Sequence, residues 1–69
     1  MFEVMDVSDI SRRRVIATGA SFEEAKAIIK DLGVIHMEDD AAFPGTADAF
    51  LKDGRLMMVQ PVGFVARKP

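Results

Sequence analysis

The chain has 69 residues, nine Lys and Arg against eleven Asp and Glu, a net charge of -2 and no cysteine. This length predicts one domain near the lower limit of what a single hydrophobic core can stabilise. The absence of cysteine excludes disulfides, thiolate metal sites and cysteine nucleophiles, and the acidic balance argues against bulk electrostatic capture by nucleic acid or anionic membranes.

The first third of the chain predicts a β-hairpin. Two runs of β-forming residues, 2–7 and 14–18, flank a segment, 8–12, whose Ser and Asp residues favour a turn. Gly19 is expected to end the second strand. Because successive side chains of a strand point to opposite faces, the apolar run Val15-Ile16-Ala17 offers apolar groups to both faces of the sheet.

An amphipathic helix is predicted over 22–32. Ser21 and Glu24 have the spacing of a capping box, in which each side chain bonds a free backbone N–H of the first turn. Gly33 is expected to end the helix in the left-handed conformation, with Val34 against Ile29. Spacings of three and four place one apolar set on the buried face, Phe22, Ala25, Ile28, Ile29 and Leu32, and turn a second set outward, Glu23, Lys26, Ala27, Lys30 and Asp31.

A short strand, 34–37, is expected after the helix, and the acidic cluster 38–40 is expected to end it. The segment 46–52 has two interpretations. It is either a short helix capped by Thr46, or it contains a strand joined by a two-residue Asp53-Gly54 turn to the strand 55–60. The strand 55–60 is common to both interpretations.

The C-terminal part has no strong pattern. Pro61 lacks an N–H, so it either ends the strand 55–60 or places that strand at a sheet edge. A further edge segment over 62–66 and a frayed tail over 67–69 complete the expected organisation. The predicted fold class is α+β: one domain, 1–66, with a small antiparallel sheet covered on one face by the helix. No apolar run is long enough to cross a membrane and no targeting signal is visible, so a soluble cytoplasmic protein is expected.

Two groups of charged residues are candidate sites. Arg12, Arg13 and Arg14 could contact phosphates or an acidic partner, although strand alternation sends Arg13 to the face opposite the other two. His36 and Glu38 share a strand face about 6 to 7 Å apart, which makes them the weak candidates for a metal-responsive site. A solvated turn and a solvated strand end are the simpler interpretations of these two groups.

Catalysis is not expected. His36 is the only histidine, and the serines at 8, 11 and 21 have turn or capping roles. The five glycines are isolated at element boundaries, so they form neither a dinucleotide motif nor a phosphate loop. We therefore expect no cofactor and identify no small-molecule ligand.

The run Leu56-Met57-Met58-Val59 is apolar on both faces of its strand. One helix covers one face, so the other stays partly apolar unless the C-terminal tail, the segment after Phe43 or a second chain covers it. We predict a non-catalytic protein-interaction module or homodimeric accessory subunit that uses an apolar sheet face or an edge strand. Its predicted partner-binding residues are Met57, Val59, Val15 and Ala17; a nucleic-acid accessory protein using Arg12 to Arg14 is the alternative.

Overall fold

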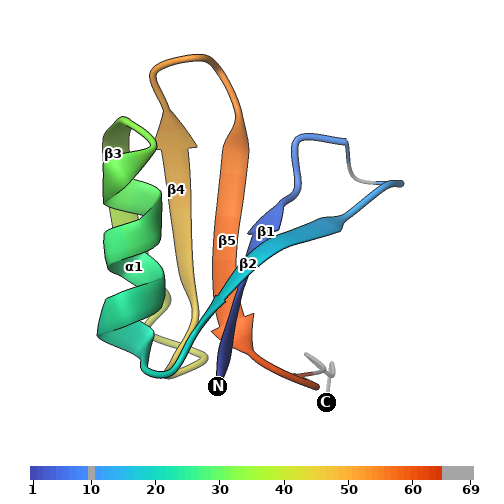
Figure 1. Cartoon of the computed structure of the whole chain (residues 1–69), viewed down its shortest axis with the longest axis vertical. Coiled ribbons are helices and arrows are strands. Elements are labelled where there is room, and N and C mark those ends of the chain that lie inside the picture. The colour runs from blue at the N-terminus through green and yellow to red at the C-terminus, as the bar shows by residue number, and fades with distance from the viewer. Residues whose placement is uncertain (10, 65–69) are drawn as a thin grey trace.

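Five strands form one antiparallel sheet, and a single helix covers one of its faces (Figure 1). The structure is a computed structural model that describes residues 1–9 and 11–64. Its elements are β1 (Phe2–Asp6), β2 (Arg14–Gly19), α1 (Phe22–Asp31), β3 (Val34–Asp39), β4 (Ala47–Leu51) and β5 (Leu56–Pro61). The predicted α+β class is confirmed, with three strands after the helix.

The strand order is β2-β1-β5-β4-β3, so the last strand of the chain lies in the middle of the sheet. The hairpin β1–β2 forms one side, α1 crosses to the far edge, and β3, β4 and β5 return to the centre. Pro61 is the last residue of β5 and lies beyond the end of the β4 pairing, where Ala47 is opposite Val59. Its missing N–H therefore interrupts no bond to β4, and Pro61 ends a central strand instead of marking an edge.

The capping box at the start of α1 is confirmed with one difference. The Glu24 N–H donates to Ser21 Oγ over 3.1 Å, whereas the Glu24 carboxylate accepts from the Ala20 N–H over 2.9 Å instead of from Ser21. At the other end, Gly33 has the expected left-handed φ of 92° and its N–H donates to the Lys30 carbonyl. Sequence-local hydrogen bonds therefore fix both ends of the helix.

Two expectations in the middle of the chain are corrected. The acidic cluster does not end β3 at residue 37, because Glu38 and Asp39 pair with Asp48 and Ala47 of β4 and the strand continues to Asp39. The segment 46–52 contains the strand β4, so the helical interpretation is wrong. Thr46 does not cap a helix, since its hydroxyl donates to the Phe43 carbonyl over 2.6 Å.

The β4–β5 turn is longer than the predicted two residues. The Leu51 N–H donates to the Arg55 carbonyl over 2.9 Å, so Lys52, Asp53 and Gly54 form a three-residue loop. Gly54 has a φ of 92°, the left-handed conformation that a three-residue hairpin loop places at its last position. Asp53 accepts from the Arg55 backbone and guanidinium, and these hydrogen bonds lower the pKa of Asp53.

The core lies between α1 and the sheet. Ala25 and Ile29 of the helix are fully buried, Phe22 and Ile28 are half-buried, and Leu32 at the end of the predicted apolar face is 38% exposed. The sheet contributes alternate residues of its strands: Val4, Ala47, Ala49, Leu51, Met57 and Val59. α1 is too short to cross a membrane, and no other helix occurs in the described ranges.

The expected outward, solvent-facing position of Lys26 on the helix is wrong. Its ammonium lies 3.3 Å from both Glu23 and Asp39 and 4.3 Å from the centre of the Phe22 ring, with only 14% of the side chain exposed. Burial opposes its charge, but the two carboxylates outweigh that effect and raise the pKa of Lys26. Lys26 therefore joins the helix to β3 instead of facing solvent.

The expected edge segment after Pro61 is not a strand where it is described. Residues 62 and 63 form a turn, and the Phe64 N–H donates to the Pro61 carbonyl. The Phe64 ring meets the Phe43 ring edge-on at 5.7 Å. Residues 65 and 66 of that segment and the tail 67–69 lie outside the described residues.

Candidate interaction surface

The face of the sheet opposite α1 is covered by no helix or strand of the described chain, and we call it the open face (Figure 1). Strand alternation and the burial pattern assign its residues, because the buried residues of β4 and β5 face the helix and their neighbours face away. The open face carries Glu3, Met5, Val15, Thr18, His36, Glu38, Asp48, Phe50, Leu56, Met58 and Gln60.

One row of cross-strand neighbours crosses the centre of the open face. From β2 to β3 it consists of Val15, Met5, Met58, Asp48 and Glu38, each opposite the next. Val15 is 52% exposed, whereas Met5, between Val15 and Met58, is 6% exposed. The row therefore changes from apolar on β2, β1 and β5 to acidic on β4 and β3.

A second apolar row lies beside the first, towards the β4–β5 turn. It contains Leu56 and Phe50, which pair with each other and are each 43% exposed, followed by His36 on β3. On the other side of the central row, the open face is polar: Thr18 and Gln60 flank Glu3, and the Gln60 amide donates to the Glu3 carboxylate over 3.1 Å. Polar groups thus border an exposed apolar strip.

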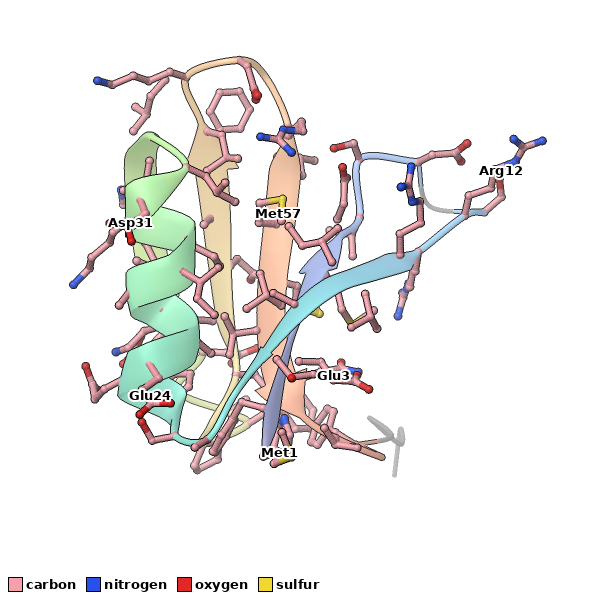
Figure 2. The ribbon with its side chains drawn as sticks, in the orientation of Figure 1. Met1, Glu3, Arg12, Glu24, Asp31 and Met57 are labelled. Atoms are coloured by element: carbon pink, nitrogen blue, oxygen red, sulfur yellow. The ribbon has the colours of Figure 1, made fainter. Side chains whose placement is uncertain are left out.

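Only one of the four predicted partner-binding residues lies on the open face. Met57 and Val59 are 1% and 0% exposed beneath α1, and Figure 2 shows Met57 on the helix side of β5. Ala17 pairs with Val4 on that same side and is half-buried, which leaves Val15. The prediction for Met57 and Val59 was wrong because β5 is apolar at every position from 56 to 59. The sequence therefore does not indicate whether Leu56 and Met58 or Met57 and Val59 face the helix.

Phe50 is the functional candidate that sequence reasoning missed. Its signal was the alternation of Asp48 and Phe50 with three apolar residues, which identifies a strand with one buried face. That signal was too short to exclude the helical interpretation of the segment.

The three arginines are divided by the hairpin. Arg14 is in β2 opposite Asp6, whereas Arg12 lies at the exposed hairpin tip in Figure 2 and Arg13 lies between them. Hydrogen bonds from Ser8 lower the pKa of Asp6, and the charges of Arg55 and Arg14 add to that effect. Within the described residues, no carboxylate lies at ion-pair distance from the three guanidinium groups.

His36 and Glu38 do come together. His36 Nε2 is 3.5 Å from Glu38 Oε2, and both side chains are more than two-thirds exposed. The rest of the acidic cluster is directed elsewhere, because Asp39 binds Lys26 and Asp40 accepts from the Ala42 N–H. In the described ranges, no three His, Asp or Glu side chains are grouped in a way that could hold a metal ion.

Comparison with known protein families finds no family model that matches the chain, and comparisons with curated proteins and with solved structures find no match either.

Proposed function

We propose that this chain is a non-catalytic protein-interaction module that associates through the open face of its sheet. The observation that carries the proposal is the exposed apolar strip formed by Val15, Phe50 and Leu56, each between 43% and 52% exposed, around the half-buried Met58. Contiguous apolar surface with a polar border is typical of a protein–protein contact. In a chain this small, covering the strip also adds stability that the single core lacks.

The open face is a better candidate than an edge strand. Both outer strands have an irregular register: the β1–β2 pairing shifts between Val4 and Met5, and the β3–β4 pairing shifts between Val34 and His36. Such irregularities bend an edge and reduce its capacity to add another strand. Association through the face needs no free edge.

The open face is also favoured over the arginine turn as a nucleic-acid site. Asp6 lies opposite Arg14, and Asp9 belongs to the same hairpin loop, where it accepts bonds from Ser11. These carboxylates offset part of the basic charge that phosphate binding needs. No aromatic residue of the described loop is available for base stacking.

Two measurements on the purified chain test this proposal. Light scattering across a concentration series detects self-association. Binding of another purified protein is measured with this chain immobilised on a surface. Phe50→Lys, at the β4 end of the strip, should weaken either interaction at least about tenfold. Leu32→Lys is the matched control, because Leu32 is 38% exposed at the end of α1, away from the open face.

The proposal fails if Phe50→Lys, shown to be folded by circular dichroism, associates as strongly as the unchanged chain. DNA binding that weakens with salt and disappears when Arg12, Arg13 and Arg14 are all changed to Gln would favour the nucleic-acid alternative instead.

A further inference from the structure

We infer that the partner of the open face is a basic amphipathic helix of another protein. Its apolar side packs on the apolar strip, and its Lys or Arg side chains meet Glu38 and Asp48. The inference rests on the proposed function and adds the chemistry of the partner. Three features of the described residues carry it: a pair of carboxylates beside the strip, methionines within the strip, and strands whose backbone groups are already paired.

The two carboxylates lie on the β3 side of the apolar strip. Asp48 is opposite Met58 on β5 and opposite Glu38 on β3. Phe50 lies two residues further along β4, on the same face as Asp48. Directly opposite side chains have Cβ atoms about 5 Å apart, so the two carboxylates form an unfavourable like-charge pair next to apolar side chains. A cation bound here would relieve that repulsion.

The chain itself supplies no cation to this pair within the residues 1–9 and 11–64. Glu38 contacts His36 over 3.5 Å, and neither carboxylate lies at ion-pair distance from a Lys or Arg of those ranges. Arg13, directly before β2, is directed to the open face by strand alternation, but β2 lies three strand spacings, or about 14 Å, from β4. That separation exceeds the Debye length of about 10 Å at 0.1 M salt. The complementary positive charge therefore has to come from the partner.

Methionines form the middle of the apolar strip. Met58 is half-buried and lies opposite Met5 of β1, between the more exposed Val15 on one side and Phe50 and Leu56 on the other. Methionine has three rotatable bonds and a polarizable thioether, so a surface that contains it adapts to apolar side chains of different shape. Such a surface suits the face of an amphipathic helix, on which apolar residues recur three and four apart.

A helix fits the open face better than a strand does. β5 pairs with β1 on one side and with β4 on the other without a register shift, so its backbone groups are used within the sheet. A partner on this face has to satisfy its own backbone groups, as a helix does internally. The strip extends from β2 to β4, about 14 Å, and the 10 residues of α1 on the opposite face form a helix about 15 Å long. A segment of about three turns therefore matches the strip.

A second copy of this chain fits the charges of the open face less well. When two copies stack with Met58 over Met58, an axis along β5 places Glu38 of one copy over Val15 of the other. The same axis places Asp48 over Met5. An axis across the strands places Glu38 over Glu38 instead. The first arrangement buries carboxylates against apolar side chains, and the second brings like charges together.

Peptide binding tests the chemistry of the partner. The probe is a designed helical peptide of about 14 residues, with Leu on one face and Lys on both sides of that face. It carries a fluorophore, and binding is followed by fluorescence anisotropy. One control peptide has Glu in place of every Lys, and another has the residues of the probe in an order without an apolar face. The Lys peptide should bind the unchanged chain at least about tenfold more tightly than either control.

Two double variants separate the carboxylate pair from the net charge of the chain. Asp48→Asn with Glu38→Gln should weaken binding of the Lys peptide about three- to tenfold at low ionic strength, with a smaller loss at high salt. Asp31→Asn with Glu23→Gln removes the same charge from the exposed side of α1 and should bind like the unchanged chain. The first variant also relieves a like-charge pair, so its urea midpoint should not fall. Its loss of binding then does not result from unfolding.

The outcomes separate this inference from the proposed function. Loss of Lys-peptide binding in the Asp48 and Glu38 variant and in Phe50→Lys, but not in the α1 variant, supports the inference. Equal losses in the two double variants, equal binding of the Lys and Glu peptides, or binding unchanged by Phe50→Lys overturns it. A chain that does not bind the Lys peptide, yet self-associates or binds another protein through Phe50, overturns the inference and leaves the proposed function standing. Absence of every Phe50-dependent interaction overturns both.

Discussion

Among the glycines, Gly19 has the closest contact with a neighbouring backbone, so Gly19→Ala is predicted to lower the unfolding free energy. A Cβ added there would lie 2.8 Å from the Ala25 nitrogen, 3.1 Å from its Cα and 3.2 Å from the Glu24 carbonyl carbon. All three are backbone atoms of α1, so no flexible side chain can move to make space. The helix would have to move away from the sheet, and Ala25 and Ile29 would lose part of their packing.

The expected loss of unfolding free energy is about 1 to 3 kcal/mol, the usual cost of inserting one methyl group into a well-packed contact. A domain of this size is stable by only about 3 to 10 kcal/mol, so the variant would lose a large share of its stability. The chain has no Trp or Tyr, so urea unfolding is followed by far-ultraviolet circular dichroism at one fixed protein concentration.

Gly54→Ala is the comparison variant, because it adds the same methyl group at a site without a close contact. Nothing lies within 4 Å of a Cβ at Gly54, but its φ of 92° is unfavourable for alanine and costs about 1 to 2 kcal/mol. Gly19 is not among the positive-φ glycines, so its whole loss must come from the contact with the helix. A Gly19→Ala variant with the urea midpoint of the unchanged chain would refute the reasoning.

Three further predictions concern the helix cap, an ion pair and acid stability. Ser21→Ala removes the acceptor of the Glu24 N–H and should lower the unfolding free energy by about 1 kcal/mol in urea titrations. A double-mutant cycle of Lys26→Met and Asp39→Asn should give a coupling below about 1 kcal/mol, because the Asp39 side chain is 59% exposed; a larger value would contradict this. The pKa of Asp6 is lower in the folded chain than its ordinary value of 3.8, so its stabilisation is present above about pH 4 and disappears as the pH falls through the lowered pKa. Asp6→Asn should therefore be less stable than the unchanged chain at pH 7, and the difference should vanish in unfolding titrations near pH 2.

The parts of the fold that could be predicted are those fixed by neighbours in sequence. The helix was predictable because Ser21, Glu24 and Gly33 determine both of its ends through local hydrogen bonds. The hairpin β1–β2 was predictable for a related reason, since the Asp6 and Asp9 carboxylates accept hydrogen bonds from the backbone N–H groups of Ser8 and Ser11 in the loop between its strands.

The parts that could not be predicted depend on distant partners. Glu38 and Asp39 look like a strand end in sequence, and they continue β3 only because β4 supplies a partner for each. Lys26 looks solvent-facing until the crossing of α1 brings it to Asp39, 13 residues away. The candidate surface depends on distant partners as well, since the pairing of β5 with β1 and β4 decides that Met57 faces the helix and Met58 faces away.

The apolar character of β5 on both faces has a consequence for the architecture. An antiparallel sheet covered on one side usually alternates apolar and polar residues, whereas strands apolar on both faces are typical of sheets buried between two layers. The outer strand β3 follows the first pattern, with His36 and Glu38 on the open face and Met37 towards the core. The central strand β5 follows the second pattern, with Leu56 and Met58 on the open face. Apolar residues concentrated on the open side of the middle strand are what a second layer over β5 would bury.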